Sequence, residues 1–523
     1  MDVGAQPAQW RSAFERDRTG RPAFPDPLPE RRLARLLAAH IVAGLFFMVL
    51  PGTVLGVWNL VGITSQRQLA GVSSAWIQAH GHAQFFGWFG TFIIGISLYT
   101  LPKFRGAVCR SIPAAWAVWA LWTAGVGLRW VAGIQNAAHP AQFRTAAILE
   151  SAAGILFVWE LTAVGPKRSQ RQAWELPIFA GLAALLLLLG WQMWLTMHPL
   201  TTPALPAKPD RILISLAIWG FAFPCVEGYS AKLFPGLIGT APAHRAGLCA
   251  AMLLLVAGAV GIAFDSPLWS SAALLPAAVL AAWALRVFHG KKGTVKTTGV
   301  YHRYPQFAQL AYIWLLVSAV LGFGVPHPGF LGASRHAFTV GFLATLVFAI
   351  GPRILPAFLN SRELWSARLM RISLLLITAG CTLRVLLEPL AYGNIVALAW
   401  KALPVSALTE LAAVLLFAFN IAMSLATPIP AWFGRKHVND RMSVYWLISS
   451  YPVTRKLMVE KGLVTLAKAE SVPRSLTLRE AAEADAVRPD LLVDTLGDFF
   501  ESRLPRSLRQ PFRISESTRS TNK

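Results

Sequence analysis

Histidines beside two long apolar runs are the residues of this sequence best suited to chemistry. His80 and His82 lie in the stretch Gln78–Gln84, which leads into the apolar run Phe85–Leu101. His336 precedes a second apolar run. An imidazole at the edge of hydrocarbon is costly unless it pairs, lines a cavity or binds a cofactor. These three histidines are therefore candidate functional residues.

The spacing separates the two neighbouring histidines. On a helix, His80 and Gln84 are four residues apart and share a face, whereas His82 points elsewhere. Two neutral imidazoles from facing helices can bind a haem iron as axial ligands. One interpretation of this pattern is a b-type haem with His80 and His336 as iron ligands, and His82 as the substitute ligand for His80. The alternative is a pair of interfacial histidines that bond loop carbonyls.

The composition is that of a membrane protein. Of 523 residues, 55% are hydrophobic and 14% charged, and the mean hydropathy is +0.50. A soluble protein could not bury so much apolar surface, whereas a bilayer accepts helices of about 20 apolar residues. The net charge of +23 collects in short loops and at both ends, which suits anionic lipid. No zinc-finger spacing or aromatic–basic repeat supports nucleic-acid binding, and the four cysteines include no C-x-x-C pair.

The apolar runs predict an all-α, polytopic fold with twelve membrane-spanning helices. The expected spans are Leu33–Asn59, Ser74–Leu101, Pro113–Val131, Phe143–Val164, Leu176–Met197, Ile212–Pro235, Ala246–Phe264, Ser270–Phe288, Phe307–Val325, Arg335–Leu359, Ile372–Tyr392 and Leu403–Ala426. Lys and Arg gather in the loops after even-numbered spans, which by the positive-inside rule places both termini in the cytoplasm. We expect a polar N-terminal arm (1–32), a membrane domain (33–426) and a cytoplasmic tail (427–523).

The tail has the pattern of a small helical module. Thr477 and Glu480 fit a capping box at the start of an amphipathic helix. A second helix is expected over Pro489–Ser502, and residues 515–523 have the composition of a disordered segment. Such a module would suit docking of another protein. The second helix should place five residues on one apolar side: Leu491, Leu492, Leu496, Phe499 and Phe500.

Several motifs resemble the catalytic subunit of haem–copper oxidases and nitric oxide reductases. Ala79-His80-Gly81, with Phe85-Phe86-Gly87 after it, resembles the second helix, whose histidine is an axial ligand of the low-spin haem. The stretch from His336 to Gly341 resembles the tenth helix, whose H-x-H pair serves the low-spin and the catalytic haem. Phe223 to Gly228 resembles the H-x-x-V-E-G motif of the sixth helix. The resemblance implies a haem–copper-oxidase-like bundle over the membrane domain.

The departures from that superfamily bear on function. Phe223 stands where the sixth helix would carry a metal-binding histidine, and Ser334 stands at the first position of the H-x-H pair. The seventh span, Ala246–Phe264, contains no histidine. The resemblance therefore implies that the ligands of the second metal and of the catalytic haem are lost, while the low-spin pair is kept.

The sequence resembles the NnrS family more closely. The similar stretches are His80-Gly81-His82-Ala83, with Gly87 and Gly90, and the tenth-helix stretch that begins at His336. Membership implies a haem-binding protein of the bacterial inner membrane, with copper as a further candidate metal. It also implies tolerance of nitric oxide and nitrosative stress, with a gas such as nitric oxide as the ligand. Turnover of a substrate is left open.

Two charged residues in the last two spans need partners. Arg384 lies about two turns from the end of the eleventh span, and Glu410 lies a similar distance into the twelfth. A short loop joins these spans, so we expect an Arg384–Glu410 ion pair. The alternative for Arg384 is a haem propionate.

The other buried polar residues have structural readings beside the functional ones. Glu150, Glu160 and Glu227 suit protonated groups that hydrogen-bond between helices. Cys225 suits either a copper ligand or small apolar packing. Three outer loop histidines are weaker candidates for a cofactor or metal: His139, His198 and His327.

Two other functions remain open from the sequence. One is an active gas reductase or quinol oxidase with unusual metal ligands, using Glu227 and Cys225. The other is a cofactor-free transporter, although inverted repeats with interrupted helices are not visible in the sequence.

Overall fold

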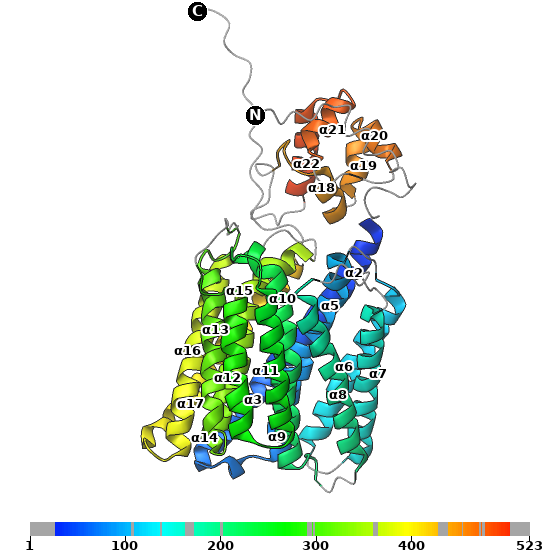
Figure 1. Ribbon diagram of the computed structural model, residues 1–523. Helices are drawn as coiled ribbons and strands as arrows, with labels where there is room; N and C mark the ends of the chain where they lie inside the picture. The colour runs from blue at the N-terminus through cyan, green and yellow to red at the C-terminus, as the bar shows by residue number, and fades with distance from the viewer. Residues whose placement is uncertain are drawn as a thin grey trace, which may run out of the picture. The chain divides into compact units, whose positions relative to one another are not determined.

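The computed structural model describes two helical units of the chain (Figure 1). The described residues are 27–105, 109–135, 139–162, 172–198, 202–289, 295, 299–358, 364–426, 438–451, 453–469, 472 and 476–502. The membrane unit comprises 33–355 and 366–422, and the second unit contains the C-terminal helices. The expected disordered segment, 515–523, lies outside the described residues, as does most of the N-terminal arm.

The membrane unit contains the twelve spans that the sequence predicts. Apolar runs of this length form helices because a helix satisfies every backbone polar group inside hydrocarbon. Four spans include a π-helical segment (η1, η3, η5 and η7). The elements are α2 (Pro27–Phe47), η1 (Met48–Val54), α3 (Leu55–Gln66), η2 (Leu69–Gly71), α4 (Ser74–His82), η3 (Ala83–Gly90), α5 (Thr91–Phe104), α6 (Ile112–Ile134), α7 (Pro140–Thr162), α8 (Glu175–Met197), α9 (Ala207–Leu216), η5 (Ala217–Ala222), α10 (Phe223–Leu237), α11 (Arg245–Ala263), α12 (Pro267–Ala284), α13 (Tyr304–Leu321), η6 (Gly322–Gly324), α14 (Pro328–His336), η7 (Ala337–Ala344), α15 (Thr345–Phe358), α16 (Ala367–Tyr392) and α17 (Ala397–Ala426).

The tenth span begins earlier than predicted. The sequence placed its start at Arg335, but α14 begins at Pro328, so His336 lies about two turns inside the helix. The His327 side chain caps this helix by accepting a hydrogen bond of 3.2 Å from the Gly329 backbone N–H. Proline in the first helical turn needs no donor there, which favours this start. His80 lies at a similar depth in α4, which begins at Ser74.

Two of the π-helical segments lie in the spans that carry the candidate histidines. Segment η3 follows His82 directly, and η7 follows His336 directly. In η1 the freed carbonyl of Met48 accepts a hydrogen bond of 2.8 Å from the Thr53 hydroxyl. Such single π turns inside α-helices are frequent at functional sites, because they shift the side chains that follow around the helix axis.

Glycine allows the first two spans to pack closely. A Cβ at Gly87 would lie 2.8 Å from the Phe47 side chain, and a Cβ at Gly52 would lie 2.7 Å from the Gln84 amide. Small residues at helix contacts let backbones approach in membranes, where no hydrophobic force drives the helices together. The close approach brings Gly52 beside the helix that carries His80.

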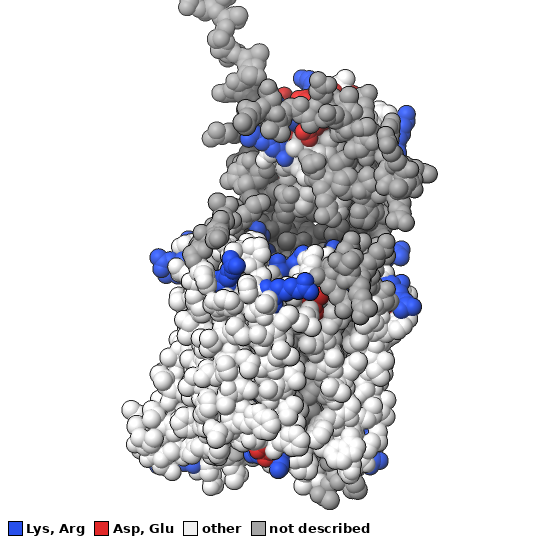
Figure 2. All heavy atoms as spheres, in the orientation of Figure 1, with Lys and Arg blue, Asp and Glu red and all other residues white. Residues whose placement is uncertain are grey.

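Lys and Arg gather around one end of the membrane unit, as Figure 2 shows. They lie at the end of α5, in the first turns of α11 and α16, and near the end of α10 and α15. The residues are Lys103, Arg105, Lys232, Arg245, Arg353, Arg368 and Arg371. This asymmetry is the feature on which the predicted orientation depends.

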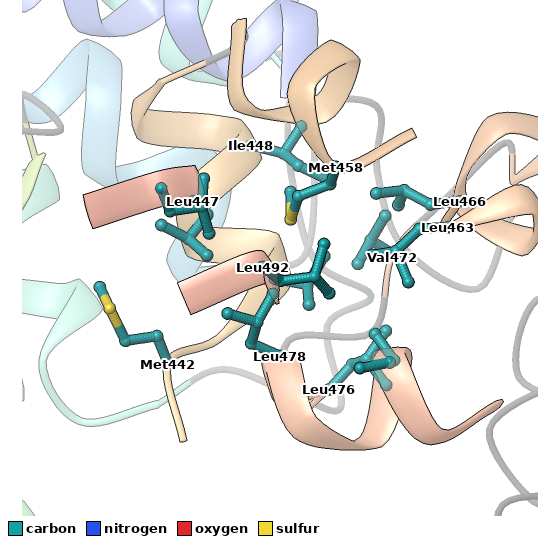
Figure 3. Packing of buried hydrophobic residues seen from close by; sticks show 14 of the residues in the cluster. Met442, Leu447, Ile448, Met458, Leu463, Leu466, Val472, Leu476, Leu478 and Leu492 are labelled. Carbon is teal, nitrogen blue, oxygen red and sulfur yellow. The ribbon is translucent and has the colours of Figure 1, made fainter. Parts of the chain in front are cut away.

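The C-terminal unit is larger than the two predicted helices. It has α18 (Val444–Ser450), α19 (Val453–Glu460), α20 (Val464–Lys468), α21 (Leu478–Ala484) and α22 (Pro489–Glu501). Figure 3 shows their leucines, Met442 and Met458 packed into one cluster. The predicted capping box is confirmed: the Thr477 hydroxyl accepts from the Glu480 N–H, and the Thr477 N–H donates to the Glu480 carboxylate.

The predicted apolar side of α22 needs one correction. Leu492, Leu496 and Phe500 recur every four residues and are fully buried, and Phe499 packs against the same cluster. Leu491 is exposed, because it lies about 100° around the helix from Leu492 and faces away from the cluster. Only one face of α22 contacts the cluster, so Leu491 and Leu492 cannot both be buried in it.

Candidate functional site

A cavity of about 320 Å³ opens inside the membrane unit where spans one, two, six, ten, eleven and twelve meet. We call it the two-histidine cavity. Its volume lies within the range of small-molecule and cofactor pockets. Most of its walls are apolar, and its polar side chains come from all six spans: Thr53, Asn59, Gln78, His80, Gln84, Asp210, Arg335, His336, Thr339, Arg384, Glu388, Tyr392 and Glu410.

His80 reaches this cavity from α4 in a fixed orientation. Its Nδ1 lies 2.9 Å from the backbone carbonyl oxygen of Gly52. The ring also packs against Gly56, where a Cβ would lie 2.5 Å from the His80 Cε1. Bonding of Nδ1 to a carbonyl leaves Nε2 as the acceptor nitrogen. The structure therefore presents His80 Nε2 as the available nitrogen.

His336 reaches the same cavity from α14 and is held in the same manner. Its Nδ1 lies 2.9 Å from the Gly332 carbonyl oxygen and 3.6 Å from Oε2 of Glu388. Neither His80 nor His336 uses Nε2 in a hydrogen bond with the described residues. A ring nitrogen bonded to a carbonyl or carboxylate is the usual support of a metal-ligating histidine. The donor set fits a haem with two axial imidazoles, and both line one cavity.

Arg384 lies in this cavity but its partner differs from the prediction. Its Nε donates to Oε2 of Glu388 over 3.1 Å, one helical turn along α16. The predicted Arg384–Glu410 pair is wrong: Oε1 of Glu410 is buried and has no hydrogen-bond partner among the described residues. Residues four apart on a helix are neighbours, whereas a cross-helix pair needs the right rotation of both helices. The i, i+4 spacing was the signal that could have identified Glu388.

Two further charged side chains of the cavity were not singled out from the sequence. Arg335 and Asp210 both line it, from α14 and α9. Nε of Arg335 is buried without a hydrogen-bond partner among the described residues. Arg335 and Arg384 therefore supply two cations beside the two histidines, where carboxylate groups of a ligand would be stabilised.

His82 faces away from the cavity, as the helix-face argument predicts. Its Nε2 lies 3.0 Å from Oε1 of Glu150, and Gln192 donates to the other Glu150 oxygen over 2.7 Å. Its ring stacks on Phe86 with centroids 4.7 Å apart. His82 does not line the two-histidine cavity. The network joins spans two, four and five, in keeping with the expected helix–helix role of Glu150.

The comparisons with known proteins identify the family and the fold. Residues 28–429 match the sequence profile described as NnrS protein. The chain belongs to the NnrS family. The fold is similar to that of a haem–copper terminal oxidase solved as a dimer by cryo-electron microscopy, with a TM-score of 0.54, 11% identity and coverage of 89% of this chain and 99% of the other. None of the curated proteins compared with the chain matches it.

In this NnrS-family chain, aromatic rings pack around Phe223, and Ser334 bonds to a neighbouring helix. Phe223 and Phe338 contact Trp219 with ring centroids 5.6 and 5.0 Å apart. Ser334 exchanges hydrogen bonds with Ser318: each hydroxyl donates to the other residue's carbonyl, over 2.9 and 2.8 Å. The described residues contain no group of three or more His, Cys, Asp or Glu side chains positioned to hold a metal ion.

The remaining predicted polar residues have local partners. Glu227 accepts a hydrogen bond of 3.1 Å from the Tyr312 hydroxyl, and Glu160 accepts one of 3.2 Å from the Ser111 backbone N–H. Cys225 is buried against Gly181. Two of the loop histidines are placed at helix ends, with His198 Nδ1 at 2.8 Å from the Trp194 carbonyl and His139 directly before α7.

Proposed function

We propose that this NnrS-family membrane protein binds one b-type haem, which His80 and His336 would hold through their Nε2 atoms. The observation that carries the proposal is that both imidazoles line one cavity, each with Nδ1 on a backbone carbonyl and Nε2 free. These histidines come from the second and tenth spans, which the oxidase-like fold brings together. His82 is not proposed as a ligand, because Glu150 engages its Nε2.

The chain's own residues would hold and tune the haem. The Gly52 and Gly332 carbonyls fix the two rings, so little rotamer entropy is lost on ligation. Arg335 and Arg384 would provide positive charge for the propionates, and Glu388 keeps Arg384 in place. When bound, a haem with two imidazole ligands supplies reversible one-electron exchange.

The family relationship supports a role in tolerance of nitric oxide and nitrosative stress, and we propose this role for the chain. The described residues lack a cluster suited to copper, so the proposal does not extend to a second metal. We further propose a bacterial inner-membrane location with both termini in the cytoplasm. The basic residues at one end of the membrane unit support that orientation by the positive-inside rule.

Optical spectra of the purified full-length protein test the haem proposal. The wild type should show the spectrum of a low-spin haem, and His80→Ala and His336→Ala should each lose it. His82→Ala should keep it, because His82 lies in a separate network. His198→Ala is the control, since that side chain is exposed at the end of α8.

The size-exclusion profile of each variant separates ligand loss from misfolding. A wild type without haem, or an unchanged low-spin spectrum in both alanine variants, would contradict the proposal. Loss of the spectrum in His82→Ala alone would move the ligand assignment to that residue. If cells that carry His80→Ala survive nitric oxide exposure less well than cells that carry the wild type, the result would support the physiological role.

A further inference from the structure

A second, smaller hollow of about 80 Å³ lies beside the two-histidine cavity. We call it the serine chamber. It is formed by α9, η5, the α11–α12 turn, α12, α13 and α14, and it shares Ile218, Leu331 and Arg335 with the two-histidine cavity. Its polar lining residues are serines, two arginines and one aspartate: Arg211, Ser215, Asp265, Ser266, Ser270, Ser271, Ser318, Ser334 and Arg335.

Some of these polar groups already have partners inside the protein. Ser318 and Ser334 bond each other, and the Ser270 hydroxyl donates to the Pro267 carbonyl over 2.9 Å. Asp265 is paired with Arg211 at 2.7 Å and with Lys208 at 3.3 Å. The only carboxylate of the chamber wall is therefore neutralised by two cations. A bound cation would find no free negative charge there.

Other polar groups have no protein partner in the described part of the chain. Ser271 is 4% exposed and its hydroxyl makes no hydrogen bond there. Nε of Arg335 is buried without a hydrogen-bond partner there, although Nη2 lies 3.4 Å from the Arg211 carbonyl. The carboxylates of Asp210 and Glu388 interact with the Arg335 charge without forming an ion pair with it. Unsatisfied buried donors are costly, and such groups are normally matched by a ligand, water or ion. Both free groups can donate a hydrogen bond.

We propose that the serine chamber binds a small monovalent anion. The anion would accept hydrogen bonds from the Ser271 hydroxyl and from the Arg335 guanidinium. A charged guanidinium donor favours an anion over a neutral molecule, because charge-assisted hydrogen bonds are about twice as strong as neutral ones. The chamber volume restricts the ligand to a few non-hydrogen atoms, such as a halide or a small oxyanion.

The position of the chamber lets such an anion arrive from water. Arg211 and Asp265 at its rim have side chains that are 40% and 19% exposed. They lie where α9 begins and α11 ends, so an anion need not cross the hydrocarbon to enter. Figure 2 shows a small group of charges at that end of the membrane unit. Two rim cations, Arg211 and Lys208, face one carboxylate and leave the entrance positive.

Bromide binding to the purified full-length protein tests this proposal. Bromide NMR line width should rise with protein concentration and fall when chloride competes. An anomalous difference map of bromide-soaked crystals should place the ion within reach of Ser271 and Arg335. Ser271→Ala should weaken binding about tenfold, the effect of one hydrogen bond to a charged ligand.

Ser270→Ala is the matched control. Ser270 is the adjacent chamber residue, but its hydroxyl is already used by Pro267, so binding should change less than about twofold. Equal effects of the two variants would contradict the assignment, as would a line width that does not respond to protein. Bromide found only at surface lysines would also overturn it. Ser270 and Ser271 line the serine chamber and not the two-histidine cavity, so the difference between these two variants does not test haem binding.

Discussion

The two-histidine cavity and the neighbouring region around Phe338 differ in what fills the space between the helices. In the cavity, two imidazoles leave their Nε2 atoms free within about 320 Å³. Around Phe338, the rings of Trp219 and Phe342 lie at centroid distances of 5.0 and 5.3 Å. Residues of the tenth span border both regions. The comparison teaches that one helix of the bundle can border an open cavity along one part of its length and a tightly packed aromatic cluster along another.

The largest expected effect comes from removing part of the aromatic packing. Phe342 is fully buried and touches Phe338 and Tyr312, so Phe342→Ala should destabilise the protein by about 3 to 5 kcal/mol. Val340→Ala, in the wall of the cavity, should lose only about 1 kcal/mol. Denaturant unfolding in detergent measures both. Equal losses would mean that the two regions are packed alike.

A somewhat smaller effect is expected from breaking the ion pair of the cavity. Glu388→Gln leaves Arg384 without its carboxylate in a water-poor site, which should cost about 3 kcal/mol. Glu410→Gln is the control, because Oε1 of Glu410 has no hydrogen-bond partner among the described residues. Thermal unfolding of the two variants should therefore differ. A larger loss in Glu410→Gln would restore the cross-helix pair that the sequence suggested.

The third prediction concerns the space beside His80. Gly56→Ala places a Cβ 2.5 Å from the His80 Cε1 and should displace the ring, weakening haem affinity by about tenfold. Gly81→Ala adds the same atom in the same cavity, where nothing lies within 4 Å of it. Haem titration of both variants tests the difference. Unchanged affinity in Gly56→Ala would show that the orientation of His80 is not critical.

The smallest effect is expected at the rim of the serine chamber. Burial alone would raise the pKa of Asp265, but hydrogen bonds and charge from Arg211 and Lys208 outweigh it and hold this pKa below its ordinary value of 3.8. The pair therefore stabilises the fold above that pH, and the stabilisation is lost as the pH falls through the lowered pKa.

The comparison of wild type with Asp265→Asn tests that pH dependence. At neutral pH the wild type should be more stable by less than about 1 kcal/mol, because the rim is partly exposed and screened by salt. The difference should vanish in strong acid. A difference that grows with acidity would reverse the sign and contradict the pairing.

Local pattern was sufficient for the helices and for some of the site. The apolar runs predicted every span in order, and the capping box at Thr477 marked the start of α21 correctly. The 3.6-residue period separated His80 from His82, and the structure places only His80 in the cavity. These features depend on residues that are close in the sequence, so the sequence contains their whole cause.

Contacts between distant residues were not predictable in the same way. The meeting of His80 with His336 in one cavity, and the exposure of Ser271 to the serine chamber, depend on how neighbouring helices rotate about their axes. The start of α14 at Pro328 was missed because its first turns are rich in Gly and Ser and resemble a loop. A single sequence gives helix faces but does not state which faces meet.

The amino-acid sequence alone determined that this protein has twelve membrane-spanning segments and that histidines lie near one end of two of them. The tertiary structure decided that His336 lies about two turns inside its helix, that His80 and His336 share a cavity with Arg384, and that aromatic rings occupy the space around Phe338. The physical reason is that a long run of apolar residues is a local feature of the sequence, and it is sufficient to form a membrane-spanning helix. The direction in which a buried polar side chain points is set by the helices packed around it.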